Sequence, residues 1–193
     1  MPGFRSVRER RLWVAVAVAV ALLLAALYPL QFALDALRAK NLLRLSIVAL
    51  FVAGAVPAVY SVARRRASFR AWLALVATGA VYLALALAME VPQERLHLVE
   101  YGALALLVRA AVAESVAVRA LRERVTSVDV WTLGIATAVG WLDEAVQGIL
   151  PNRIYDLRDV AFNALAAGLA LAAAAALRAA MSGTERRREH AGQ

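Results

Sequence analysis

Residues 141–163 have the sequence WLDEAVQGILPNRIYDLRDVAFN and lie between two long apolar segments. The apolar residues extend from Val128 up to this stretch, and from it to Met181. A charged group at the centre of a bilayer costs about 2.5–3.5 kcal/mol on insertion scales, so an unpaired cluster of acids, amides and arginines is not stable there. The stretch is therefore predicted to form a turn at a membrane surface, where the helices on either side hold it.

The composition of the whole chain indicates that most of its surface faces lipid. Of 193 residues, 63% are hydrophobic, whereas about 45–50% is typical of a soluble domain. The apolar residues form runs of about twenty, the number that a helix needs to cross a hydrocarbon core of about 30 Å. The alternation that is typical of outer-membrane strands is not present in the sequence. We therefore expect an all-α integral membrane protein with a single domain over residues 1–193.

Cysteine usage and net charge exclude several classes of protein. The sequence has no cysteine, which excludes disulfides, thiol nucleophiles, iron–sulfur clusters and cysteine-ligated zinc. The net charge of +8 comes from arginines that sit at the ends of apolar segments, where such residues set topology and contact anionic lipid. Membrane lipid is therefore the expected partner, and nucleic acid is not.

Six segments are long and apolar enough to be transmembrane helices. They are predicted at residues 12–30, 42–63, 71–89, 96–118, 128–150 and 159–181. The first exceeds the roughly 7–15 apolar residues of a signal peptide, so we expect it to be retained. Pro29 is expected to lie where this helix leaves the membrane, and Gly54 and Pro57 are expected to bend the second. The residues after Met181 are expected to form a frayed tail.

The distribution of arginine predicts the orientation in the membrane. Six alternating spans place the N-terminus, the loops at 64–70 and 119–124 and the C-terminal tail on one side, and these four regions carry most of the arginines. By the positive-inside rule, both termini are cytoplasmic and the three polar turns lie outside. We expect a multi-pass protein of the inner (cytoplasmic) membrane.

Polar residues are predicted to gather at the outer ends of the last three spans. In the fourth span, His97, Glu100 and Tyr101 are three and four residues apart and share one helical face. The fifth span and the start of the sixth add Asp143, Glu144, Gln147, Asp156, Asp159 and Asn163. Because ionisable clusters inside membranes are functional by default, we interpret these residues as one site.

Each of these residues also has a structural explanation when it is considered alone. His97 near a helix end is typical of an interfacial hydrogen-bonder. Arg153 and Arg158 stand beside Asp156 and Asp159, as in a salt-bridged turn. Hydrogen bonds between helices would account for the side-chain amides of Gln147 and Asn163. The case for a site therefore depends on the set and not on any single member.

Packing features are predicted in the same three spans. Small residues, among them Gly134 and Gly140 in the fifth span and Gly168 in the sixth, are expected to allow close helix packing. Arg109, well inside the fourth span, is expected either to extend toward the cytoplasm or to pair with Glu114.

The pattern of polar residues resembles the VanZ-like family of small bacterial membrane proteins, named after an accessory teicoplanin-resistance protein. The likeness covers about residues 90–170 and begins with HLVEY at 97–101. The matching positions here are His97, Tyr101, Asp143, Glu144, Gln147, Pro151, Arg153, Asp159 and Asn163, followed by Gly168. The first two spans match only as apolar segments. The resemblance implies a location in the cell envelope and a link to antibiotic resistance, and it implies no particular reaction.

The first functional hypothesis is an intramembrane enzyme that acts on a polyprenyl-linked or phospholipid substrate. Its candidate catalytic residues are His97, Glu144 and Asp159, with His97 or Glu144 as general base. Arg153 is a candidate clamp for a phosphate or carboxylate. The remaining residues expected to bind the substrate are Glu100, Tyr101, Asp143, Gln147, Asp156 and Asn163.

Two other functions fit the same residues. One is a non-catalytic protein that binds a lipid-linked cell-wall precursor or an amphipathic antibiotic. The other is a small transporter, although no inverted repeat is evident. A divalent cation is a minority hypothesis for a cofactor. Its ligands would be His97 and the surrounding carboxylates, whose spacing in the sequence matches no recognised metal-binding motif. The sequence does not decide whether the site is catalytic.

Overall fold

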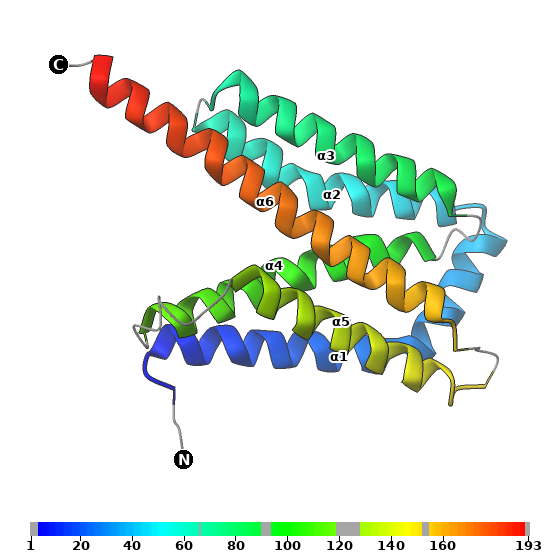
Figure 1. Cartoon of the computed structure of the whole chain (residues 1–193). Helices are drawn as coiled ribbons and strands as arrows, with labels where there is room; N and C mark the ends of the chain where they lie inside the picture. The colour runs from blue at the N-terminus through cyan, green and yellow to red at the C-terminus, as the bar shows by residue number, and fades with distance from the viewer. Residues whose placement is uncertain (1–3, 66, 90–93, 119–127, 152–154, 192–193) are drawn as a thin grey trace.

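The computed structural model of the chain is a bundle of helices (Figure 1), as the composition predicts. It describes residues 4–65, 67–89, 94–118, 128–151 and 155–191, with side chains up to residue 179. The helices in these ranges are α1 (Val7–Ala39), α2 (Leu43–Arg64), α3 (Phe69–Ala88), α4 (Arg95–Val118), α5 (Val128–Gln147) and α6 (Leu157–Ala191). No strand occurs in the described part of the chain.

The hydropathy of these helices makes the chain a multi-pass membrane protein. Five of the described helices are long and apolar enough to cross a membrane, namely α1 to α4 and residues 157–179 of α6. The remaining helix, α5, has 20 residues but carries Asp129, Asp143 and Glu144. The boundaries of α2 to α5 agree with the predicted spans to within a few residues.

The first and last helices are longer than predicted. Pro29 does not end α1, which continues for ten residues to Ala39. The continuation buries Leu34 against Leu43 and the start of α2, and the helix stops where Asn41 takes the left-handed conformation with φ of 57°. The last helix continues to Ala191 instead of fraying after Met181. Its final turns are rich in Ala, Arg and Glu, which favour helix.

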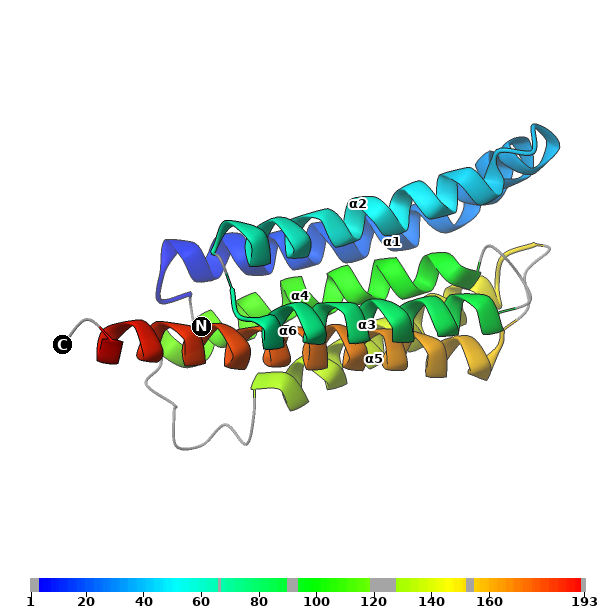
Figure 2. The ribbon, with the colours of Figure 1, turned by 90° about the horizontal axis from the view of Figure 1, so that it is seen from above.

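The fourth helix is the centre of the bundle. It contacts all five other helices, and its buried residues recur every three or four positions along its length. The outer helices α1, α2 and α3 instead expose large apolar side chains such as Leu22, Val76 and Leu87, as expected for surfaces that face lipid. Figure 2 shows the α1–α2 hairpin as a layer against α4, with its tip extending beyond the ends of the other helices.

Small residues bring α5 and α6 into close contact at one of the predicted glycines. A Cβ added at Gly140 would lie 2.9 Å from the Cβ of Asn163 on α6 and 3.3 Å from Cε1 of Tyr101 on α4. The expectation was wrong for Gly134 and Gly168, where an added Cβ would meet nothing within 4 Å. Of these three glycines, Gly140 near the end of α5 is therefore the one at a close helix contact.

A second polar cluster joins α1 to α4 at the opposite end of the bundle. The buried carboxylate of Glu9 accepts a hydrogen bond of 2.8 Å from the Ser115 hydroxyl. The indole nitrogen of Trp13 donates to the same hydroxyl at 2.9 Å. These bonds fix the first turns of α1 against the last turns of α4.

The predicted pairing of Arg109 with Glu114 was wrong. Arg109 pairs with Asp129 of α5, with Nε 2.6 Å from the carboxylate, and Glu114 pairs with Arg8 of α1. The reason is helical geometry: positions five residues apart differ by about 140° around an α-helix, so the two side chains leave α4 in different directions.

We expect Gly140→Ala to destabilise the bundle. The new methyl group would collide with Asn163 and Tyr101, and overpacking of this kind costs about 1–3 kcal/mol. Gly134→Ala on the same helix is the matched control, because its methyl group has open space and alanine favours helix by up to about 1 kcal/mol. Thermal unfolding of the detergent-purified protein should give a lower Tm for the first variant only. An equal Tm for the two would refute the close contact.

Candidate functional site

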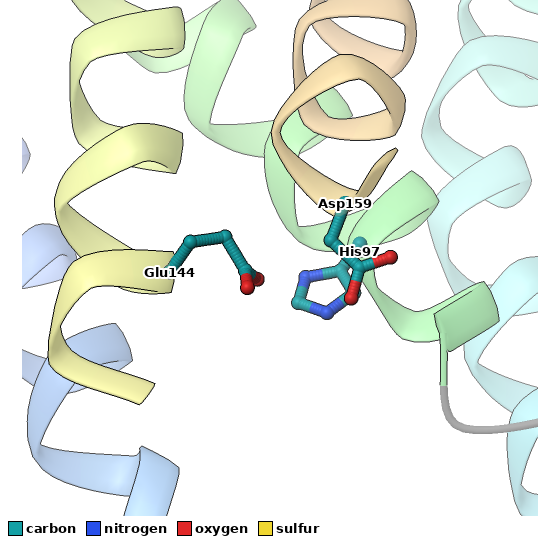
Figure 3. Close-up of side chains that lie close together, drawn as sticks. All are labelled: His97, Glu144 and Asp159. Atoms are coloured by element: carbon teal, nitrogen blue, oxygen red, sulfur yellow. The ribbon is translucent and has the colours of Figure 1, made fainter. Parts of the chain in front are cut away.

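Three helix ends meet where α4 and α6 begin and α5 ends (Figure 1). We call this region the polar end. Here His97 of α4, Glu144 of α5 and Asp159 of α6 point toward one another (Figure 3). One imidazole nitrogen and one oxygen from each carboxylate lie within 4.8 Å of one another. These three residues, the triad, are the three candidate catalytic residues, and the fold brings them together.

A second layer of residues lies one helical turn deeper in the bundle. Tyr101 follows His97 by four residues, Gly140 precedes Glu144 by four, and Asn163 follows Asp159 by four. Residues four apart lie on the same face of a helix, and the three meet at Gly140. Tyr101 and Asn163 are fully buried. The contact between α5 and α6 at Gly140 thus sets the spacing of the triad one turn away.

Asp143 lies between Tyr101 and His97. Its Oδ2 accepts a hydrogen bond of 2.9 Å from the Tyr101 hydroxyl, and the same oxygen is 3.9 Å from Nδ1 of His97. Nδ1 is also 3.9 Å from Oε2 of Glu100. A separation of 3.9 Å is too long for a hydrogen bond, but it allows an ion pair when the imidazole is protonated. His97 therefore faces two acids besides those of the triad.

Glu144 is fully buried and holds the end of α5 to the start of α6. Its Oε1 accepts a hydrogen bond of 3.0 Å from the side-chain amide of Gln147, as expected for residues that share a face. Its Oε2 accepts one of 3.3 Å from the backbone N–H of Asp156. Donors on both oxygens stabilise the buried carboxylate and fix its position.

Asp156 caps the first turn of α6. Its Oδ1 accepts a hydrogen bond of 2.8 Å from the backbone N–H of Arg158, which is the standard role of an N-cap aspartate. Arg158 itself is exposed. The contact between the two is therefore a cap and not the predicted salt bridge. Arg153, the predicted clamp, lies outside the described residues.

An aromatic pair lies beside the site on the exposed surface of the bundle. The indole nitrogen of Trp141 donates a hydrogen bond of 2.9 Å to the Tyr155 hydroxyl, and both residues are exposed. The pair links the last turns of α5 to the segment before α6. This pair is absent from the residues predicted to form the site, although tryptophan and tyrosine near the end of a span are typical of a membrane interface.

The described parts of the chain thus bring together all the predicted site residues that they contain. Five of them lie near the triad on three helices, namely Glu100, Tyr101, Asp143, Gln147 and Asn163, and Asp156 lies just before α6. In comparisons with protein-family models, curated proteins and solved structures, the chain matches none.

We expect Tyr101→Phe to lower the free energy of unfolding by about 1–3 kcal/mol, because it removes a donor from a buried carboxylate. A double-mutant cycle with Asp143→Leu isolates the contact: in that background, Tyr101→Phe should cost less by about 1 kcal/mol or more. Chemical unfolding of the four proteins in detergent measures the difference. The same cost in both backgrounds would show that the hydroxyl and the carboxylate do not interact.

Proposed function

We propose that this protein binds the polar head group of a lipid-linked cell-wall intermediate or a phospholipid at the polar end. The observation that carries the proposal is the convergence of His97, Glu144 and Asp159 from three helices. A membrane protein gains nothing in stability by gathering acids at one point, because each must be desolvated or shielded. Such clusters inside membranes are therefore interpreted as sites for a ligand.

The surroundings of the triad support a head group as the ligand. Trp141 is exposed next to the site and is hydrogen-bonded to Tyr155. Tryptophan and tyrosine concentrate at the level of lipid head groups. The nearby apolar side chains of Ile149 and Leu157 are also exposed, which gives the acyl part of an amphipathic ligand a surface to contact.

Acid–base catalysis is the second candidate function, and the position of Glu144 favours it. Its carboxylate is held by donors from Gln147 and Asp156, and it lies close to the imidazole of His97. A fixed carboxylate and an imidazole about one water molecule apart are suited to move a proton to or from a bound substrate. We propose binding as the primary function, because it needs only the geometry of the site.

Membership of the VanZ-like family is part of the proposal. Seven of the residues that carry the resemblance lie together at the polar end, which is the behaviour expected of a functional motif; they are His97, Tyr101, Asp143, Glu144, Gln147, Asp159 and Asn163. On this basis we propose a role at the outer face of the inner membrane, with both termini in the cytoplasm, and a contribution to resistance against glycopeptide antibiotics such as teicoplanin.

The binding proposal predicts that Asp159→Asn and His97→Ala weaken the affinity for a sugar-bearing polyprenyl phosphate by about tenfold or more. The carboxylate of Asp159 accepts hydrogen bonds from sugar hydroxyls and the imidazole of His97 donates to the phosphate, and hydrogen bonds with charged groups contribute about 1.5–3 kcal/mol. The measurement is native mass spectrometry of the purified protein titrated with the lipid. Asp35→Asn, in an exposed pair at the tip of the α1–α2 hairpin, is the matched control and should bind as wild type does. Wild-type affinity in both site variants would reject head-group binding at the triad.

The orientation has a separate test. A reporter that is active only outside the cytoplasm, fused after Pro151, should be active, whereas the same reporter fused after Arg65 should be inactive. The reason is the excess of arginine on the side of the 64–70 loop. The opposite pair of signals would invert the topology and place the polar end in the cytoplasm.

A further inference from the structure

The triad has the donor atoms of a site for a divalent cation. Its nitrogen and two oxygens come from three different helices and lie within 4.8 Å of one another. Ligand atoms around one ion, at metal–ligand distances of about 2.0–2.2 Å, are at most about 4.4 Å apart. Closing the triad on an ion therefore needs side-chain shifts of about 1 Å. The partly exposed side chains of His97 and Asp159 supply these shifts, because Glu144 is held by Gln147 and Asp156.

Asn163 gives a second, independent indication of a ligand. Its side chain is fully buried, and neither its amide nitrogen nor its oxygen has a hydrogen-bond partner among the described residues. An unsatisfied buried polar group costs about 1–3 kcal/mol. Asn163 lies one turn from Asp159 on the face of α6 that meets Tyr101 and Gly140. Its amide lies against Gly140, one turn deeper than the triad, where a ligand group that extends inward from the triad would give it a partner.

The charges around the triad favour a cation. Glu100 and Asp143 each lie 3.9 Å from the imidazole of His97, so further carboxylates stand beside those of Glu144 and Asp159. A phosphate that approaches these acids is repelled unless a positive charge lies between them. A divalent ion supplies that charge, and three protein ligands leave an open coordination position.

We propose that His97, Glu144 and Asp159 bind one divalent metal ion, and that this ion takes a phosphate oxygen of the head group at its open position. One imidazole and two carboxylates suit Mn²⁺ or Zn²⁺ better than Ca²⁺, which prefers oxygen ligands alone. Glu144 is the buried ligand, and His97 and Asp159 are partly exposed, so the open position faces the membrane boundary. The proposal of metal binding is independent of the function proposed above. The contact between the ion and a phosphate oxygen, here called the bridge to phosphate, rests on that function.

The metal alone is the first probe. The full-length protein, purified in detergent and stripped with a chelator, is titrated with Mn²⁺, and the free ion is followed by electron paramagnetic resonance. We expect one saturable site per chain. Asp159→Asn and Glu144→Gln should each weaken Mn²⁺ binding by about tenfold or more, because removal of even an outer-shell partner of a metal ligand costs about 10–100-fold in affinity. Titration with Zn²⁺ in competition should displace the bound Mn²⁺.

Matched controls separate a lost ligand from a damaged fold. Glu114→Gln removes a carboxylate at the other end of α4, where it pairs with Arg8, and Asp35→Asn removes an exposed one. Both should bind Mn²⁺ as wild type does. Because Glu144 also joins α5 to α6, the partly exposed Asp159 provides the decisive variant if Glu144→Gln lowers the Tm. The absence of saturable binding, or wild-type affinity in Asp159→Asn, would overturn the metal site.

The bridge to phosphate is tested with a polyprenyl phosphate in the presence and absence of Mn²⁺. Chelation should weaken lipid binding by about tenfold or more, and added Mn²⁺ should restore it in wild type but not in Asp159→Asn. Metal binding without lipid binding would reject the proposed head group and leave the metal site standing. Equal lipid binding with and without Mn²⁺ would reject the bridge alone.

Discussion

The approach of α5 to α4 and α6 at Gly140 is the constraint on which the polar end depends. The absence of a side chain there allows Asn163 and Tyr101 to occupy the space that a Cβ would fill. One turn away, the same three helices carry Glu144, Asp159 and His97. The spacing between helix backbones at the glycine therefore determines whether the three side chains can meet. A membrane helix has no hydrophobic driving force toward its neighbours, so small residues that permit van der Waals contact decide where helices touch.

Much of this arrangement could be predicted from local patterns. Runs of apolar residues are sufficient to predict the bounds of α2 to α5. A segment that crosses lipid must be helical to satisfy its backbone hydrogen bonds, and it must be long enough to span the hydrocarbon core. The spacing of three and four residues along α4 correctly predicted that His97 and Tyr101 lie on one face of the helix. The contact between His97 and Glu144 was not predictable, because residue spacing along one helix does not determine the order or the rotation of the helices in a bundle.

The errors have a common physical origin in contacts between distant segments. Pro29 is a helix breaker in isolation, but burial of Leu34 against α2 favours continuation of α1. Glu9 precedes the first apolar run and has the pattern of a solvated residue, yet it is buried through its bond with Ser115 on α4. Hydrogen bonds hold α4 at both ends, through Ser115 at one end and Tyr101 at the other. Of these two residues, Tyr101 alone belongs to the pattern of polar residues found in the sequence.

The α1–α2 hairpin, whose tip extends beyond the other helices (Figure 2), has a further consequence for the bilayer. With 33 residues, α1 is about 50 Å long at 1.5 Å per residue, against a hydrocarbon thickness of about 30 Å. Its apolar part, residues 12–34, is about 35 Å long and crosses that thickness with some tilt, while the charged ends of α1 lie beyond the hydrocarbon. The buried contacts of the hairpin tip include Leu96, the residue before His97. The tilt of the hairpin is therefore coupled by direct contact to the first turn of α4, so lipid chain length is a physical variable for this end of the protein.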